Sequence, residues 1–378
     1  MISISICKTP REWREFEDVG ELLHGAHPAF VPPYPGSIAK YLSPASAFHR
    51  RHGKIIPIIA RRDGRPVGRI AAIINRTHNA RYEDKAGFFG FFESEDKADV
   101  AQALLTEAAA TLYREGLTSI RGPYNPSIND ECGLLVENFE APPFMGLTWN
   151  PHYYEKLLLD NGFQEVRKLY GYWLPLHKLE VPERLKKIAA RAAARANLKL
   201  RPIKLHEVEK ELEIIHEVYN STLERNWGFV PITMDDLLSA ADDMRTIADP
   251  EMILIAECKG ENAGVGLSLP NINEILIQVK RTPKWLRPLH VLWLMKMTKR
   301  KTARQVVYGI SPRFRDKGGL HAWLLLEQFA SAKARFENAE LGWIEETNVE
   351  IMENSTMLGA EQHKTWKIYD KPLINQDQ

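Results

Sequence analysis

Apolar residues in the first half of the chain follow two periods, one typical of strands and one of helices. Residues 54–75 predict a hairpin, because two apolar runs flank Asp63 and Gly64, a favoured turn pair. Residues 99–116 carry apolar side chains every three or four positions and stop at Gly116, as an amphipathic helix does. The remaining predicted elements are an opening strand at 3–6, a helix at 11–25, strands at 87–93 and 118–122, a short helix at 150–162 and an extended stretch at 163–176.

The second half repeats this order. A hairpin turning at Gly260 again follows helical segments and precedes further strands and helices. The predicted helices are 215–229, 234–244, 322–336 and 351–359, and the predicted strands are 273–279, 305–311, 339–346 and 363–373. A repeated plan of this length indicates duplicated domains. We therefore expect an α/β protein with domains at 1–178 and 205–378, joined by a basic linker helix at 179–204.

The segment between the two predicted domains carries a strong local positive charge. Eight basic residues and one acid lie between Glu183 and Lys204. Five of them are spaced three or four apart, which places a basic stripe on one helix face: Arg184, Lys187, Arg191, Arg195 and Lys199. Two interpretations stay open, a solvated linker helix and a surface that contacts anionic phosphate or lipid headgroups.

Composition narrows the class of protein without selecting a function. A chain of 378 residues with 44% hydrophobic and 26% charged residues is typical of a globular protein with two domains. The net charge of +1 gives no global attraction to nucleic acid, and we expect no nucleic-acid partner. Three scattered cysteines favour a reducing compartment. We find no signal peptide and no run near the ~18 apolar residues that span a bilayer. The prediction is a cytoplasmic protein, with a peripheral position at the inner membrane left open.

The order of elements, with SPRFRDKGG between a strand and an amphipathic helix, resembles the GNAT superfamily of N-acyltransferases. Its duplicated form is similar to a bacterial family of tandem-GNAT proteins. The segments that carry the resemblance are GPYNPSINDECGLLVENFEAPP, NPHYYEKLLLDNGF, ERNWGFVP and ELGWIEETN. The resemblance covers nearly the whole chain and implies two GNAT-like domains, each a mixed, mainly antiparallel sheet flanked by helices. It also implies an acyl-CoA donor, an amine acceptor and no metal. Some members of such families are proposed to acylate long-chain sphingoid bases, as bacterial ceramide synthases.

The resemblance places a pyrophosphate site at the run from Arg315 to Leu320. Backbone amides at a helix start attract phosphate, and glycine lets the backbone approach closely. Arg315 and Gly318 fit the superfamily loop, whereas Leu320 and Asp316 depart from it. The residues expected to bind the coenzyme are Ile310, Arg313, Arg315, Lys317, Gly318, Gly319 and Asn348. An ordinary glycine turn before a helix is the alternative.

The corresponding loop of the first half has no glycine and is rich in acidic residues between Glu93 and Asp99. Close carboxylates repel a pyrophosphate. We therefore expect the first domain to bind no coenzyme and to act as a scaffold or as one wall of the acceptor site.

Amide formation from a thioester needs a neutral amine, a polarised carbonyl and a proton for the leaving thiolate. The resemblance assigns polarisation to a strand bulge or splay point near Tyr308 to Ile310, where Gly309 interrupts an apolar strand; a simple packing glycine is the alternative. It assigns the base to Glu346, with Glu345 as the second candidate; both also suit surface or helix-capping roles. The superfamily's tyrosine position is occupied by Ser355, which leaves Tyr308 and Tyr369 as candidate proton donors.

Two further segments are candidates for binding the acceptor. Tyr219, Asn226, Trp227 and Phe229 cluster before the second hairpin, where the superfamily forms its acceptor lip, although a packed turn explains them equally well. Asn129 and Asp130 belong to a turn-rich run that either satisfies local amides or faces the acceptor.

Residues 280–304 hold nine Lys or Arg and no acid, flanking the apolar WLRPLHVLWLM. Aromatic rings with basic flanks suit a membrane interface, while a buried helix or strand with solvated ends is the alternative.

The sequence therefore predicts an acyl-CoA-dependent N-acyltransferase acting on a primary amine, with a long-chain base as the most specific acceptor. Two other functions stay open: a non-catalytic acyl-CoA or lipid-binding protein, and an aminoacyl transferase of the Fem type. The second needs no glycine-rich loop, so the RFRDKGG run argues against it.

Overall fold

The computed structural model describes residues 1–244, 247–315 and 319–373, and the chain divides into two compact units. Unit 1 comprises Met1–Leu169, Asn273–Thr298 and the C-terminal segment from Lys364. Unit 2 comprises Tyr170–Ile272 and Lys299–His363. These units differ from the predicted boundaries, because residues 273–298 and the end of the chain pack with the first half. The assignment of 1–178 and 205–378 as separate domains stays a prediction.

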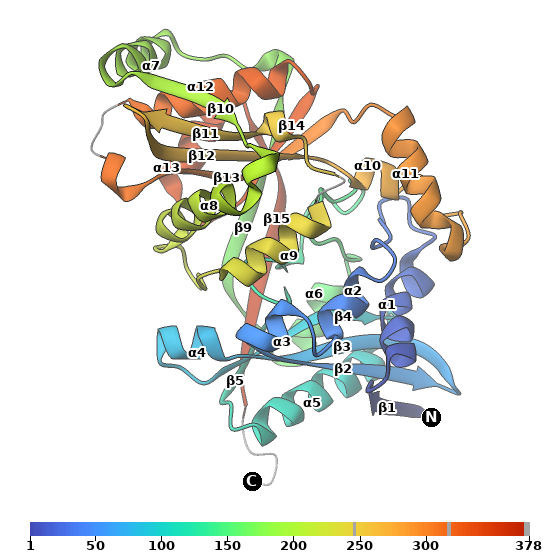
Figure 1. Ribbon diagram of the computed structural model, residues 1–378. Helices are drawn as coiled ribbons and strands as arrows, with labels where there is room; N and C mark the ends of the chain where they lie inside the picture. The colour runs from blue at the N-terminus through green and yellow to red at the C-terminus, as the bar shows by residue number, and fades with distance from the viewer. Residues whose placement is uncertain (245–246, 316–318, 374–378) are drawn as a thin grey trace. The chain divides into compact units, whose positions relative to one another are not determined.

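Unit 1 is a sheet with helices on both faces (Figure 1). Its strands run in the order β1-β2-β3-β4-β5, and the end of β15 (Glu361–Pro372) pairs antiparallel with β5. The strands are β1 (Ile2–Ile6), β2 (Gly53–Arg62), β3 (Arg65–Asn75), β4 (Ala86–Ser94), β5 (Ser119–Gly122) and the short β6 (Tyr124–Asn125), β7 (Glu131–Cys132) and β8 (Leu134–Leu135). The helices are α1 (Pro10–His24), α2 (Ser37–Leu42), α3 (Ala47–Arg51), α4 (Arg76–Tyr82), α5 (Ala98–Arg114), α6 (Tyr154–Asp160), α10 (Asn273–Leu276), the 3-10 turn η4 (Lys284–Leu286) and α11 (Arg287–Met297).

The core of unit 1 follows from the alternation of its strands. Ile56, Ile58 and Ala60 of β2 lie on one face and pack with the apolar side of α5, including Leu104. Helix α1 contacts β2, β3 and β4 and covers the other face. The predicted hairpin is confirmed, with Asp63 and Gly64 both at positive φ between β2 and β3.

Unit 2 repeats the plan. Its strands run β14-β13-β12-β11-β10, and residues 170–175 of β9 belong to the same unit. The strands within unit 2 are β10 (Leu198–Pro202), β11 (Ile253–Cys258), β12 (Glu261–Pro270), β13 (Thr302–Ile310) and β14 (Asn338–Glu345). The residues of β9 (Gln164–Pro175) and β15 (Glu361–Pro372) are divided between the two units. The helices are α7 (Glu183–Ala196), α8 (Val208–Leu223), α9 (Met234–Met244), α12 (Leu320–Lys333) and α13 (Val349–Met357), with 3-10 turns η1 (Leu176–Lys178), η2 (Leu205–Glu207), η3 (Pro250–Met252) and η5 (Pro312–Phe314).

Helices again cover both faces of the sheet in unit 2. Leu320, Trp323 and Leu324 of α12 pack with Ala256 and Ala263 on one face, together with α7. On the opposite face, Leu212, Ile215 and Val218 of α8 pack with β11 and β12.

Two sequence predictions of local structure need correction. Residues 273–279 were expected as a strand but begin with the helix α10, because Ile275 and Leu276 are both buried on a short turn rather than on alternate faces. The basic linker helix predicted at 179–204 is the shorter α7, which ends at Asn197 with positive φ. Residues 198–202 form the edge strand β10, paired with β11.

Candidate functional site

The parallel pair β13–β14 separates before either strand ends. The two strands pair from Thr302 opposite Asn338 to Gln305 opposite Leu341. Beyond this point β13 continues to Ile310 and β14 to Glu345, and the described strands provide no partner for β13 on its β14 side. Helix α12 follows β13 after a short connection, so a helix start and two diverging strand ends belong to the same region of unit 2.

Part of the predicted phosphate loop is described. Arg313 is exposed and lies 3.7 Å from Glu217 of α8. Arg315 donates to two backbone carbonyls, those of Ser221 at 2.6 Å and Ile310 at 3.4 Å. Lys317 and Gly318, with Asp316, lie outside the described residues. Arg315 therefore ties the end of β13 to α8, and its role at a phosphate stays a prediction.

Gly319 occupies the position that begins α12. Its φ of +90° is in the region that favours glycine, and a β-carbon there would lie 2.8 Å from the Cβ of Ala192 and 3.0 Å from the carbonyl of Ile188. Helix α7 therefore packs directly against the start of α12. The basic stripe predicted on α7 is exposed to solvent at all four of its helical members, Arg184, Lys187, Arg191 and Arg195.

The irregularity in β13 lies closer to its middle than the sequence suggested. The register opposite β12 is regular from Val307 to Ile310, and it shifts between Val307 and Gln305, which leaves Val306 as the extra residue. The bulge alternative is therefore not found at Tyr308 to Ile310, whereas the splay alternative fits, because these residues lie beyond the last β13–β14 pair at Gln305. Gly309 is also a close-packing position, because a β-carbon there would lie 2.2 Å from the hydroxyl of Thr222 in α8.

The candidate proton donors already have partners. The hydroxyl of Tyr308 donates to the carbonyl of His321 in α12, and burial raises its pKa. Tyr369 is fully buried in unit 1, where its hydroxyl donates to Glu155 at 2.6 Å; burial and this bond raise its pKa. Ser355 donates to the carbonyl of Ile351 within its own helix.

The two candidate bases stand at the end of β14, before α13. Glu345 is buried and accepts hydrogen bonds from the amide and the hydroxyl of Thr347. Glu346 is half-buried. Asn348 caps α13 through its backbone, because its carbonyl accepts from the amides of Ile351 and Met352. The local bonds hold Glu345 in place and give it a structural role at the strand end.

Of the predicted acceptor residues, Tyr219 lies in α8, and Asn226, Trp227 and Phe229 lie in the connection between α8 and α9. Tyr219 and Phe229 lie with ring centroids 6.4 Å apart, and Phe229 is buried. Asn226 and Trp227 are half-buried, and the carbonyl of Asn226 accepts from the amide of Phe229. This hydrogen-bonded turn fits the packed-turn alternative, while the half-buried Trp227 stays a candidate contact for the acceptor.

Asn129 and Asp130 belong to unit 1 and to a closed turn. The hydroxyl of Ser127 donates to Asp130 at 2.6 Å and accepts from the amide of Asn129 at 3.2 Å. Tyr41 also donates to Asp130. These contacts support the structural alternative for this run.

The neighbouring Asn125 has a role that the sequence did not reveal. Strands β4 and β5 pair only from Ala86 to Phe88, so β4 also continues beyond its parallel partner. There the side chain of Asn125 accepts from the amide of Phe91 at 2.6 Å. A β-carbon at Gly90 would lie only 1.5 Å from the carbonyl of Tyr124. The segment β6 thus occupies the place beside β4 just beyond the parallel pair.

Two acids near the start of α5, Glu95 and Asp99, form ion pairs within unit 1. Arg62 lies 3.2 Å from Glu95 and 3.1 Å from Asp99. The amide of Lys97 donates to the carbonyl of Glu95, and the amide of Glu95 donates to Val67. The carboxylates of Glu95 and Asp99 and the amides of Glu95 and Lys97 therefore already have partners within unit 1.

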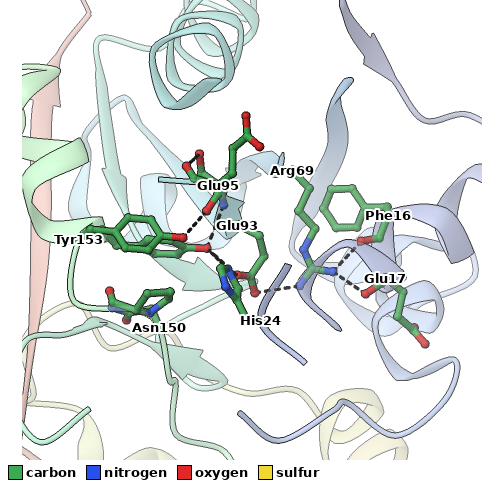
Figure 2. Close-up of polar contacts among 11 residues, drawn as sticks. Phe16, Glu17, His24, Arg69, Glu93, Glu95, Asn150 and Tyr153 are labelled. Atoms are coloured by element: carbon green, nitrogen blue, oxygen red, sulfur yellow. Dashed lines mark hydrogen bonds and ion pairs between the residues drawn. The ribbon is translucent and has the colours of Figure 1, made fainter. Parts of the chain in front are cut away.

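A buried polar network in unit 1 was missed by sequence analysis (Figure 2). Glu93 of β4 accepts from the hydroxyl of Tyr154 at 2.8 Å and lies 3.3 Å from Nε2 of His24 and 3.4 Å from Arg69. Arg69 also donates to the carbonyls of Phe16 and Glu17 in α1. No regular spacing links these positions, which come from α1, β3, β4 and α6, so the sequence offered no signal for them.

The network is stabilised electrostatically. Burial alone would raise the pKa of Glu93, but the hydrogen bond from His24 and the charge of Arg69 outweigh it and hold that pKa below its ordinary value. Burial and the adjacent Glu93 raise the pKa of Tyr154, whose hydroxyl also accepts from the amide of Ser94 at 2.9 Å. Because its members are bonded to one another, we interpret the network as structural.

The described residues contain neither a metal-binding cluster nor a helix that could span a membrane. Residues 1–244, 247–315 and 319–373 contain no group of three His, Cys, Asp or Glu side chains placed to hold a metal ion. No helix in these ranges combines the length and apolar character needed to cross a bilayer.

Comparison with solved structures defines the class of fold. A structure described as a tandem GNAT protein from the clavulanic acid biosynthesis pathway covers 100% of both chains with a TM-score of 0.59 at 12% identity. A GCN5-related N-acetyltransferase from Sphaerobacter thermophilus covers 99% of this chain and 96% of its own with a TM-score of 0.51 at 12% identity. The protein has the tandem GNAT fold, as the sequence predicted. No family model matches the chain.

Two curated proteins are similar in sequence. Protein YghO of Escherichia coli (strain K12) is 30% identical over 319 residues, which are 83% of this chain and 81% of that protein. The chain therefore belongs to the bacterial tandem-GNAT family of Protein YghO. A protein of Caulobacter vibrioides (strain NA1000 / CB15N) named bacterial ceramide synthase is 28% identical over 98% of both chains.

Proposed function

We propose that the protein is an acyl-CoA-dependent N-acyltransferase whose second unit transfers an acyl group from a CoA thioester to a primary amine. One observation carries this proposal: β13 and β14 pair over only four residues, and α12 is the next α-helix after β13. Backbone amides at the start of α12 suit a pyrophosphate, since the first amides of a helix have no partner within it. The neighbouring α7 adds exposed positive charge to this end of unit 2.

The reaction balances without an acyl-enzyme. The amine nitrogen attacks the thioester carbonyl, a C–N bond forms, the C–S bond breaks, and the coenzyme leaves as a thiol. Glu346 takes one proton from the ammonium form of the acceptor, directly or through water, and so gives the neutral amine that attacks. The second proton that the nitrogen loses as the amide forms goes to the leaving thiolate. We favour Glu346 over Glu345, because Glu346 occupies the position that the family resemblance assigns to the base and is half-buried, whereas Glu345 is buried.

For the acceptor, we propose a long-chain sphingoid base, which would make the product a ceramide. The support is the similarity, over 98% of both chains, to a protein named bacterial ceramide synthase. The half-buried Trp227 in the α8–α9 connection is the residue that we expect to contact the acceptor.

The test measures free thiol. Purified protein is incubated with acetyl-CoA or palmitoyl-CoA, each with and without sphinganine or a short-chain amine. We expect thiol release from palmitoyl-CoA that depends on sphinganine and that falls strongly in Glu346→Gln. Glu350→Gln, an exposed acid in the next helix, is the matched control.

The outcomes separate the competing functions. Release with a different amine would retain the N-acyltransferase and reject the sphingoid acceptor. If none of the amine-containing mixtures releases thiol and acyl-CoA raises the melting temperature, catalysis is rejected in favour of an acyl-CoA-binding protein.

A further inference from the structure

Helix α11 and the turn η4 that precedes it expose an unusual set of large apolar side chains in unit 1. We call this set the α11 face; its exposed fractions are 80% for Trp285, 64% for Leu289, 44% for Leu292, 57% for Trp293 and 68% for Met297. Spacings of three and four residues place these side chains on one side of the helix. Single exposed apolar residues are ordinary, but a contiguous set with two tryptophans indicates an interaction surface.

The opposite side of α11 is firmly attached to unit 1. Arg287, Val291 and Leu294 are buried, with exposed fractions of 4%, 2% and 7%. The guanidinium of Arg287 binds the carboxylate of Glu21 in α1 through two nitrogens and also donates to the carbonyl of Thr282 at 3.0 Å. The α11 face is therefore held outward on a fixed helix.

Positive charge surrounds the α11 face. Residues 280–304 contain nine Lys or Arg and no acid. Several of these side chains are exposed on either side of the apolar residues: Arg281, Lys284, Lys296 and Lys299. Lys284 lies 2.6 Å from Asp18, so the net positive charge rests mainly on the other three.

We propose that the α11 face docks on the surface of an anionic phospholipid bilayer, with the helix lying in the plane of the interface. Tryptophan prefers the headgroup level of a membrane, and basic residues near an anionic surface strengthen binding about fivefold each. Eleven residues of helix measure only about 16 Å, roughly half the hydrocarbon thickness, so α11 lies on the membrane rather than across it.

Charge argues against a second copy of the chain as the occupant. Two α11 faces placed together would bring basic side chains such as Lys296 and Lys299 into proximity, and residues 280–304 contain no acid to pair with them. An anionic lipid surface supplies the complementary charge for every one of these residues.

Vesicle co-sedimentation of the full chain tests the proposal. Binding is compared between vesicles of phosphatidylcholine and vesicles of phosphatidylcholine with phosphatidylglycerol at three to one. We expect binding to the anionic vesicles that weakens as salt is raised. The variant Trp285→Ser/Trp293→Ser should lose about tenfold or more in apparent affinity, and Lys296→Glu/Lys299→Glu should lose a comparable factor on anionic vesicles only.

The matched control is Tyr113→Ser/Leu159→Ser, which removes two exposed apolar side chains from α5 and α6 of the same unit. It should bind as the unmodified protein does, and circular dichroism and thermal midpoints should show that all variants fold. Equal binding by the tryptophan variant and the control would overturn the proposal. So would an absence of binding to any vesicle, or self-association in solution that the tryptophan variant abolishes.

This inference does not depend on the proposed chemistry. Thiol release from acyl-CoA with a soluble short-chain amine needs no membrane. Vesicle binding by a protein without transferase activity would therefore leave the α11 face as a membrane surface, and activity without vesicle binding would overturn only the docking.

Discussion

In unit 1 the side chain of Asn125 accepts from the amide of Phe91 just beyond the β4–β5 pair, whereas in unit 2 the described strands leave the corresponding stretch of β13 without a partner on its β14 side. The two units reach this point with the same order of strands and helices. They differ in the connection that leaves the second strand of the parallel pair. Residues 123–153 separate β5 from α6, while only residues 346–348 separate β14 from α13.

The difference shows that one fold can have either a covered or an uncovered end at its parallel strand pair. The long connection of unit 1 folds back as β6 and uses the backbone groups of β4 for internal hydrogen bonds. The short connection of unit 2 places two glutamates directly at the strand end. A closed unit gains stability from buried polar contacts, and an unfilled strand end is where a ligand can make the missing contacts.

The largest expected effect concerns catalysis. Glu346→Gln should lower turnover about 100- to 10 000-fold, the usual contribution of a general base. Glu93→Gln should change turnover by less than about twofold per folded molecule, because its partners are structural. Steady-state thiol release measures both. A large loss in Glu93→Gln with turnover retained in Glu346→Gln would place the chemistry in unit 1 instead.

The next largest expected effect is a loss of stability when the buried polar network of unit 1 is broken. Arg69→Met leaves the buried Glu93 without its cation and removes two bonds to α1, which should lower the free energy of unfolding by about 3–5 kcal/mol. The control Arg114→Met breaks an exposed pair and should lower it by less than about 1 kcal/mol. Urea unfolding measures the difference, and equal values would mean that the network contributes little.

A smaller effect is expected from opening the closed strand of unit 1. Asn125→Ala leaves the amide of Phe91 without its acceptor and should lower the free energy of unfolding by about 1–3 kcal/mol. Ser3→Ala, which removes a long bond at an exposed site, should change it by less than about 0.5 kcal/mol. Thiol release should persist in both variants. Its loss in Asn125→Ala would show that β6 supports the reaction rather than closing unit 1.

The smallest effect is a difference in acid sensitivity. The pKa of Glu93 is held below its ordinary 4.5 in the folded protein, so its contribution to stability is present above about pH 4.5 and is lost as the pH falls through the folded pKa. The stability difference between the unmodified protein and Glu93→Gln should therefore shrink below pH 4.5. Urea unfolding at pH 7, 5 and 4 measures it. A difference that stays constant would mean that Glu93 is not charged in the fold.

Local sequence signals predicted the elements of both units well. Asp63-Gly64 and Lys259-Gly260 turn the two hairpins, and the glycine at 319 precedes α12, because turn chemistry is set by neighbouring residues. The error at 273–279 has a physical cause: a short apolar run has too few residues to distinguish a period of two from one of 3.6.

Features that join distant positions were beyond sequence patterns. His24 and Tyr154 are 130 residues apart, and their hydrogen bond depends on α1 and α6 meeting at β4. The position of the bulge at Val306 depends on how β12 pairs with β13, which neither strand reveals alone. The roles of Glu346 and of the run 315–320 were taken from a family resemblance, and they stay predictions for the experiments above.

The pairing of β15 with β5 bears on how the protein is made. Tyr369 and Pro372 lie opposite Gly122 and Ser119, so the sheet of unit 1 includes a strand segment that follows all of unit 2 in the sequence. On the ribosome, the first unit must wait until unit 2 and β15 have been synthesised before its last strand can join. Cutting the coding sequence at its midpoint would leave the N-terminal half with an unpaired sheet edge, the kind of edge that promotes aggregation.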